Sequence, residues 1–263
     1  MINKIIFRQY DIRGIVNKEL TKENSKLIGY YLGLTIKEKY PQITPYIIVG
    51  YDIRTHSQML FEALISGINL SSCKVLDIGL VATGVNYFAS FQEYEINNKT
   101  IKPTASIMIT GSHNAKKYNG FKITINNEPF FGDELIDLYE KISKDSEIKI
   151  ADNFDVIKID AKSLYIDYML NQFSHLKDFP IPFIIDCGNG VANTVLCEVL
   201  DKLNLNYKGL HLVPDGEFPN HHPDPTNEKN LEDLKVLLKD EYNLGFAYDG
   251  DADRIAVLTQ KYN

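Results

Sequence analysis

A short acidic segment late in the sequence has the residue types of a cation site. It reads Tyr248-Asp-Gly-Asp-Ala-Asp-Arg254, with three carboxylates at alternate positions and small residues between them. Carboxylates this close repel one another unless a cation lies between them, and Mg²⁺ takes hard oxygen ligands of this kind. We therefore predict that Asp249, Asp251 and Asp253 bind a metal; the alternative is a solvated acidic turn. An EF-hand is excluded, because this loop lacks the glycine and the glutamate that the motif needs at its sixth and twelfth positions.

A second segment places a serine beside a glycine just past an apolar run. Thr110-Gly-Ser-His-Asn114 is followed by Asn119-Gly-Phe-Lys122. The glycine allows backbone or ligand to approach Ser112 closely. The segment is not a nucleophile elbow, which needs glycine at positions 110 and 114, and the adjacent Ser112 and His113 are weak evidence for a hydrolase triad. From these residues alone, a hydrogen-bonded turn and a reactive serine both stay open, and Lys122 is either a surface lysine or a base that also contacts phosphate.

The remaining polar segments carry weaker signals. In Phe7-Arg-Gln-Tyr-Asp-Ile-Arg-Gly14, Tyr10 and Arg13 either grip a phosphate through forked hydrogen bonds or belong to an arm tied down by salt bridges. His221-His222 stands between prolines, which favours a rigid loop over a metal site. Gly188-Asn-Gly190 lacks the full phosphate-loop pattern, so turn and helix-cap chemistry is the better account. No partner is predicted for His56, His175 and His211.

Apolar strands alternate with segments of helical spacing along both halves of the chain, and these elements must position the polar segments. We expect strands at 47–51, 74–78, 106–110, 121–125, 183–187, 207–212 and 245–248, and helices at 55–70 (with Thr55 and Ser57 as possible caps), 132–144, 190–203 and 228–243. This alternation predicts α/β layers with a largely parallel sheet, whose carboxyl edge collects ligands. Mixed charges without helical period over 144–160 place a boundary there, between a first domain at 1–150 and a second at 151–263.

Composition and charge exclude several classes of protein. The 263 residues are 44% hydrophobic, which excludes disorder as the main state. The net charge of −7 and the absence of a long basic run argue against nucleic-acid and membrane-surface partners. No stretch approaches the roughly 20 apolar residues that a membrane span requires. Three cysteines without Cys-x-x-Cys spacing argue against a disulfide scaffold and against a zinc site, and they indicate a reducing compartment. The N-terminus does not resemble a signal peptide. We expect a cytoplasmic protein; its oligomeric state stays open.

Six segments together resemble the α-D-phosphohexomutase superfamily, and within it the bacterial phosphomannomutase/phosphoglucomutase group. They occur in the family's order and span nearly the whole chain. The segments are Tyr10-Asp-Ile-Arg-Gly14, Val49-Gly-Tyr-Asp-Ile-Arg54, Thr110-Gly-Ser-His-Asn114 with Asn119-Gly-Phe-Lys122, Asp186-Cys-Gly-Asn-Gly190, Pro214-Asp-Gly-Glu-Phe-Pro219 with His221-His-Pro-Asp-Pro225, and Asp249-Gly-Asp-Ala-Asp-Arg254.

The resemblance implies a fold of two three-layer α/β/α domains with mixed, largely parallel sheets, and an isomerase that interconverts hexose 1-phosphate and hexose 6-phosphate of mannose or glucose. Ser112 would carry a phosphoryl group and exchange it with the sugar through a hexose 1,6-bisphosphate. Mg²⁺ would be held by the three aspartates and the Ser112 phosphate, whose charge of about −1.5 to −2 requires cations nearby. The implied catalytic residues are Ser112, Lys122 as general acid/base, His113 and Arg13, and the implied substrate contacts are Tyr10 and Arg254.

Two departures from the family pattern affect what the chain is expected to do. Ala115 stands where the family usually has proline. Family members also continue into a third domain that recognises the sugar and a fourth that clamps a phosphate, and these have no counterpart here. We therefore expect a fragment, domains 1 and 2 of four, with little turnover alone. The other interpretations are a non-catalytic phosphosugar-binding module and, built on the acidic loop alone, a sugar-nucleotide transferase.

Overall fold

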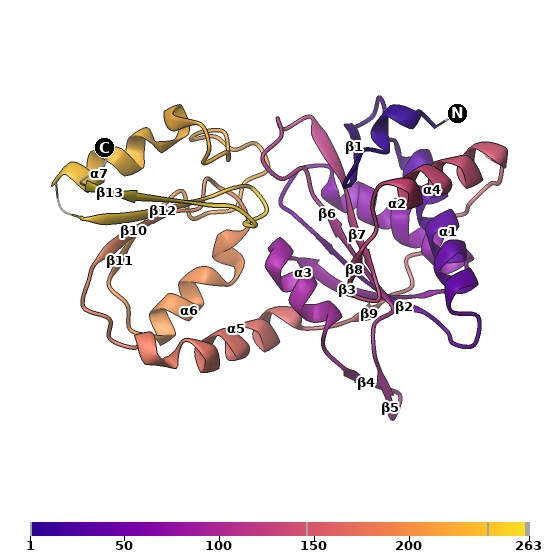
Figure 1. Cartoon of the computed structure of the whole chain (residues 1–263), viewed down its shortest axis with the longest axis horizontal. Helices are drawn as coiled ribbons and strands as arrows, with labels where there is room; N and C mark the ends of the chain where they lie inside the picture. The colour runs from indigo at the N-terminus through magenta and orange to yellow at the C-terminus, as the bar shows by residue number, and fades with distance from the viewer. Residues whose placement is uncertain (1, 146, 241, 261–263) are drawn as a thin grey trace.

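Two sheets lie side by side in the computed structural model of the chain, which describes residues 2–145, 147–240 and 242–260 (Figure 1). The helices are α1 (Lys22–Lys39), α2 (Ser57–Leu70), α3 (Thr83–Ser90), α4 (Asp133–Lys144), α5 (Ala161–Gln172), α6 (Leu196–Lys202) and α7 (Glu232–Asp240), with short 3-10 turns η1 (Lys4–Ile6), η2 (Ser174–Leu176), η3 (Ala192–Thr194) and η4 (Glu228–Leu231). No helix within these ranges is long and apolar enough to cross a bilayer.

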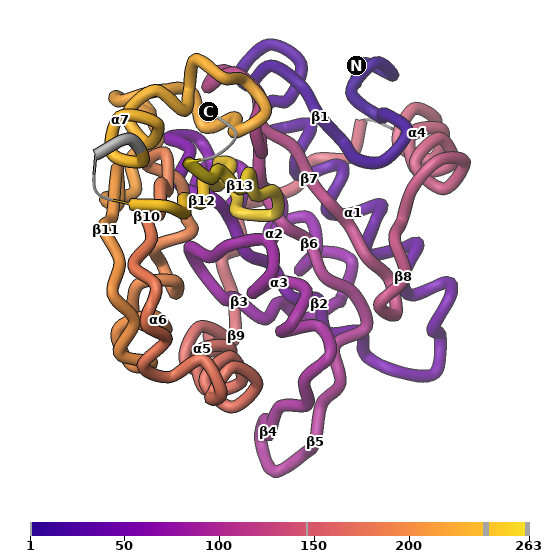
Figure 2. Tube along the Cα trace, turned by 60° about the vertical axis from the view of Figure 1, so that its left-hand side comes forward, coloured from indigo at the N-terminus to yellow at the C-terminus, as the bar shows by residue number. Residues whose placement is uncertain are grey.

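The first sheet is mixed. Its order is β1-β7-β6-β2-β3-β9, with β8 paired to β7. Strands β6, β2, β3 and β9 run parallel to one another, whereas β1, β7 and β8 form antiparallel pairs. The strand bounds are β1 Ile12–Ile15, β2 Tyr46–Tyr51, β3 Lys74–Leu80, β6 Ala105–Ile109, β7 Tyr118–Ile125, β8 Glu128–Pro129 and β9 Ile157–Lys158. A separate hairpin, β4 (Tyr94–Ile96) with β5 (Lys99–Ile101), projects away from the sheet (Figure 2).

The second sheet is smaller and has the order β11-β10-β12-β13. The first three strands are parallel and β13 is antiparallel to β12. Their bounds are β10 Phe183–Asp186, β11 Tyr207–Leu210, β12 Leu244–Tyr248 and β13 Ile255–Thr259. Apolar clusters lie on both faces, with α6 on one side and α7 on the other. The predicted fold class, two α/β units with mixed, largely parallel sheets, is confirmed.

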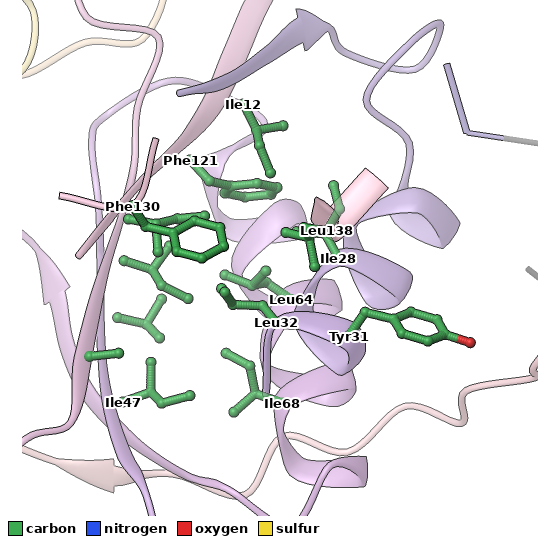
Figure 3. Packing of buried hydrophobic residues seen from close by; sticks show 14 of the residues in the cluster. Ile12, Ile28, Tyr31, Leu32, Ile47, Leu64, Ile68, Phe121, Phe130 and Leu138 are labelled. Atoms are coloured by element: carbon green, nitrogen blue, oxygen red, sulfur yellow. The ribbon is translucent and has the colours of Figure 1, made fainter. Parts of the chain in front are cut away.

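Alternating residues of the first sheet serve two cores. Ile47, Val49 and Ile107 face the helices α1, α2 and α4, where Phe121 and Phe130 point toward Ile28, Leu32 and Leu64 (Figure 3). The intervening residues face the other way, as the strand period of two requires. They pack with α3, α5 and α6 in one apolar cluster, which includes Ile48, Met108, Val85, Ile166 and Val199. This second core joins the two units, because its members come from the first sheet and from helices of the second half.

Several elements differ from the sequence-based expectation. Helices α1, α3 and α5 were not predicted, although Thr21 caps α1 by accepting a hydrogen bond from Asn24 N. The helix expected from residue 190 starts only at 196, because the chain first makes the turn η3. Neither expected cap of the helix at 55–70 is used: α2 starts after His56, and Ser57 Oγ donates to Asp52 instead. Strand β9 lies within the predicted boundary segment and joins the first sheet.

Candidate functional site

Ser112 lies in a tight loop directly after β6, at the carboxyl end of the parallel strands. Its φ is +49°, a left-handed conformation that is uncommon for a non-glycine residue, and it is 2% exposed. The Ser112 N–H donates to Thr110 Oγ1 at 2.7 Å, and its Oγ lies 3.2 Å from His113 Nδ1. Backbone strain of this kind persists only where the surroundings fix it, and it concentrates at functional sites.

Two buried arginines, Arg54 and Arg13, hold this loop in place through hydrogen bonds to its backbone carbonyls. Arg54 donates to the carbonyl oxygens of Ser112 and Asn114 through Nη2, at 2.8 and 2.6 Å, and to two further loop carbonyls through Nη1. Its Nε lies 3.3 Å from Asp52 Oδ2, an ionic contact without hydrogen-bond geometry. Arg13 Nη1 donates to the Gly111 carbonyl at 2.7 Å and Nη2 pairs with Asp11. A Cβ at position 111 would lie 2.2 Å from Arg54 Nε, so glycine is required there.

The acidic loop meets the serine loop from the second sheet. Ser112 Oγ donates to Asp249 Oδ2 at 2.8 Å. Asp249 and Asp251 are fully buried, and one ligand oxygen from each of Asp249, Asp251 and Asp253 lies within 4.8 Å of the others. Asp251 Oδ1 is buried and has no hydrogen-bond partner in the part of the chain that the structure describes. An orphaned buried carboxylate oxygen is costly unless a cation binds it, so the residues fit a hard divalent ion.

Charges around this cluster are strongly coupled. Burial and the neighbouring carboxylates of Asp251 and Asp253 raise the pKa of Asp249 well above its ordinary value. Burial alone would lower the pKa of Lys122, but Asp251 and Asp253 outweigh it and raise that pKa. Lys122 Nζ lies 2.7 Å from Asp251 Oδ2 and also pairs with Asp253. Lys122 is therefore an ammonium ion that partly neutralises the three aspartates.

An open cleft of about 890 Å³ leads to this cluster. Its lining includes Ser112, His113, Lys122, Arg13 and Arg254. Burial, and after it the charge of Arg254, lower the pKa of His113, which favours a neutral ring. Tyr10 is 76% exposed at the rim, where it stacks on Phe131. The cleft thus combines cationic side chains with the buried hydroxyl group of Ser112, which suits an anionic ligand.

Three further contacts around the site join the first half of the chain to the second. Thr83, at the start of α3, donates through Oγ1 to Asp251 Oδ2 at 2.7 Å, and through its N–H to the Asp251 carbonyl at 2.9 Å. His222 Nε2 lies 2.6 Å from the His113 carbonyl oxygen. The carboxyl ends of the two sheets therefore face each other across the site.

The structure brings most of the predicted site residues together. Ser112, His113, Lys122, Arg13, Asp249, Asp251 and Asp253 form one cluster, with Tyr10 and Arg254 along the same cleft. Sequence reasoning missed Arg54 and Asp52, which stood in a recognised segment without a stated role, and Thr83, for which the sequence offers no signal.

Comparison with known proteins agrees with this geometry. Residues 4–149 match the family model "Phosphoglucomutase/phosphomannomutase, alpha/beta/alpha domain I", and residues 163–262 match domain II. The chain is 35% identical over 255 residues to the phosphomannomutase/phosphoglucomutase of Pseudomonas aeruginosa, covering 97% of this chain and 52% of that protein. It is 37% identical over 263 residues to the phosphoglucomutase of Neisseria meningitidis, covering 100% and 54%. The chain thus spans about half the length of these curated relatives.

Solved structures show the same fold. A phosphoglucomutase/phosphomannomutase family protein from Burkholderia thailandensis matches with a TM-score of 0.89 and 32% identity over 99% of this chain and 56% of that one. At 22% identity, a Thermus thermophilus protein described as a putative phosphomannomutase shares the fold with a TM-score of 0.84. With both of its α/β units matched by the family models, the chain belongs to the phosphoglucomutase/phosphomannomutase family.

Proposed function

We propose that this chain carries the phosphoserine and metal site of a phosphohexomutase, which interconverts hexose 1-phosphate and hexose 6-phosphate. The observation that carries the proposal is the contact of Ser112 Oγ with Asp249 Oδ2 at 2.8 Å, beside the unpartnered Asp251 Oδ1. A serine presented directly to a cluster of metal-binding carboxylates suits phosphoryl transfer, which depends on positioning and charge stabilisation.

The position of each residue in the site indicates its role in metal binding and phosphoryl transfer. Asp249, Asp251, Asp253 and a phosphate on Ser112 would hold Mg²⁺, whose oxygen-ligand preference the cluster meets. Bound there, the ion would neutralise charge on the phosphoryl oxygens and on the carboxylates that pair with Lys122. In the transfer, the bond from phosphorus to Ser112 Oγ breaks while a bond to a sugar hydroxyl oxygen forms.

The chain's own groups then balance charge and protons. Lys122 Nζ lines the cleft and is the group placed to exchange the hydroxyl proton. Its ammonium form would be the general acid, and it would act as general base once a bound cation neutralises the carboxylates that raise its pKa. Arg13 holds the loop through the Gly111 carbonyl while lining the cleft, and His113 and Arg254 line it beside the serine. With Tyr10 at the rim, this lining supports a phosphorylated hexose as the substrate class and a hexose 1,6-bisphosphate as the species that loads Ser112.

The test measures loading of the serine, because the chain spans about half of its relatives and turnover is a property of the whole protein. The chain is incubated with glucose 1,6-bisphosphate and Mg²⁺, and phosphate is read by intact mass and peptide mapping. We expect one phosphate on Ser112, none in Ser112→Ala, and normal loading in Ser174→Ala, a control at an exposed serine. If the chain binds the bisphosphate but Ser112 acquires no phosphate, the proposed phosphoryl transfer is wrong and the chain is a phosphosugar-binding module.

A further inference from the structure

A second cluster of potential metal ligands lies where strands β10 and β11 of the second sheet end. Asp186 ends β10 and its side chain is fully buried. His211 Nδ1 lies 3.0 Å from Asp186 Oδ1, and His221 Nε2 lies 3.0 Å from Asp186 Oδ2. These ligand atoms all lie within 4.8 Å of one another, and the two rings are 12% and 14% exposed. None of these residues takes part in the site described above.

In each histidine, the ring nitrogen that points away from Asp186 (the far nitrogen) also lies within hydrogen-bond distance of an oxygen atom. His221 Nδ1 lies 3.0 Å from the His222 carbonyl oxygen, which accepts a hydrogen bond when this nitrogen carries a proton. His211 Nε2 lies 3.2 Å from Asp233 Oδ2, a carboxylate oxygen that also accepts. In the neutral tautomer that keeps its proton on the far nitrogen, each ring directs the lone pair of its near nitrogen toward the Asp186 carboxylate. Histidines that bind metals show this arrangement, in which the distal N–H donates to a carboxylate or carbonyl and fixes the tautomer.

Three acceptors that converge in a buried site need something positive between them. Either both rings take a second proton, or one cation replaces both protons. Two imidazole nitrogens and one carboxylate form a donor set for zinc and neighbouring first-row metals, in contrast to the all-oxygen aspartate cluster. We propose that Asp186, His211 and His221 form a structural site for a first-row transition metal ion, Zn²⁺ in the first instance.

The cluster ties a long loop to the sheet edge. His211 follows β11 with a φ of +49°, and His221 belongs to the loop whose next residue, His222, reaches the His113 carbonyl. Pro223 packs over Gly188. An ion at this site would therefore fix the loop that supports the backbone next to Ser112. The inference does not depend on what Ser112 does.

Isosteric amides separate a metal site from a set of hydrogen bonds. His211→Asn retains a donor at the Nδ1 position and His221→Gln retains one at the Nε2 position, so both variants keep their hydrogen bonds to Asp186 but lose a ligand. His175→Gln, at an exposed histidine, is the matched control. The probe is Co²⁺, titrated in excess Mg²⁺ and followed by its visible absorption and by calorimetry. We expect binding in the parent chain and in His175→Gln, and at least about 10-fold weaker binding in either site variant.

Two further measurements make the result decisive. Asp251→Asn should leave the Co²⁺ signal intact, because it alters only the aspartate cluster. Zn²⁺ should raise the thermal midpoint of the parent chain and not that of His211→Asn or His221→Gln, each compared with its own metal-free sample. Equal Co²⁺ binding in the parent and in both histidine variants, loss of binding in Asp251→Asn alone, or no binding in any chain would overturn the proposal.

Discussion

Arg54 is the residue whose loss should disturb the serine loop most. Its guanidinium bonds to the carbonyls of Ser112 and Asn114 and to two more carbonyls of the same loop, and its side chain is fully buried beside Asp52. Arg54→Met removes every one of these donors and leaves the Asp52 charge buried without its ionic partner. We expect the variant to fold with a loosened loop and a markedly lower free energy of unfolding.

The magnitude follows from these contacts. Breaking a buried ion pair by removing one partner costs about 3–5 kcal/mol. The Asp52 carboxylate keeps hydrogen bonds from Ser57 Oγ and from the N–H groups of Arg54 and Gly111, which limits the loss to that range. Arg54→Lys keeps the charge but replaces the planar guanidinium by a compact ammonium group, so we expect about two hydrogen bonds to be lost. The free energy of unfolding should then fall by about 2 kcal/mol. Total stabilities are about 5–15 kcal/mol, so either loss is easily measured.

Urea unfolding followed by circular dichroism measures the effect, since the chain has no tryptophan. A slope of about 1–3 kcal/mol per molar urea converts the Arg54→Met loss into a midpoint shift of about 1 M or more. Lys116→Ala is the matched control: this cation of the same loop pairs with Glu217 at the surface, where an ion pair is worth about 0–1 kcal/mol. If Arg54→Met unfolds within 1 kcal/mol of the parent, as Lys116→Ala should, the argument from these contacts is wrong.

Three further outcomes are expected. Gly111→Ala should lower the free energy of unfolding by about 2 kcal/mol or more because its Cβ meets Arg54, whereas Gly84→Ala, with its nearest neighbour at 3.6 Å, should change it by less than about 1 kcal/mol; equal urea midpoints would contradict this. Asp160→Ala should cost about 1 kcal/mol at neutral pH by uncapping α5. Hydrogen bonds from the capped residue lower the pKa of Asp160, so its stabilisation is present above the ordinary carboxyl pKa and disappears as the pH falls through the folded-state pKa, where the midpoints of variant and parent should converge. Excess Mg²⁺ should raise the thermal midpoint of the parent but not of Asp251→Asn, and a similar rise in both would place the ion elsewhere.

The two candidate loops, one with Ser112 and one with Asp249, could be predicted from the sequence, but the contact between them could not. Carboxylates at alternate positions after an apolar strand were sufficient to predict the acidic cluster, because that chemistry is local. The contact of Ser112 with Asp249 joins two sheets, and no spacing in the sequence encodes it; family resemblance supplied it. Helix α5 went unpredicted because its apolar side chains pack on more than one neighbour and give a weak helical period, as at Ile166 in the shared core.

The residues that hold the site were harder to predict than the residues that line it. Arg54 acts through backbone carbonyls, which every residue has, so the identity of its partners leaves no trace in the sequence. His211 received no predicted partner because Asp186 lies 25 positions away, on the neighbouring strand. In both instances the missing information is the order of strands in the sheet.

The bond between Ser112 and Asp249 has a consequence for how the chain acquires its site. The two residues are 137 positions apart, and Thr83 and Asp251 are separated by 168. Closing such long loops carries an entropic cost that only earlier-formed structure offsets, and contacts of this range slow folding. The serine loop can be assembled earlier, since β6 directly precedes it and Arg54 is 58 positions from Ser112 rather than 137. It gains its carboxylate partners in one of the last steps. During synthesis on the ribosome, Ser112 therefore stands without them until the strand before Asp249 has emerged and docked.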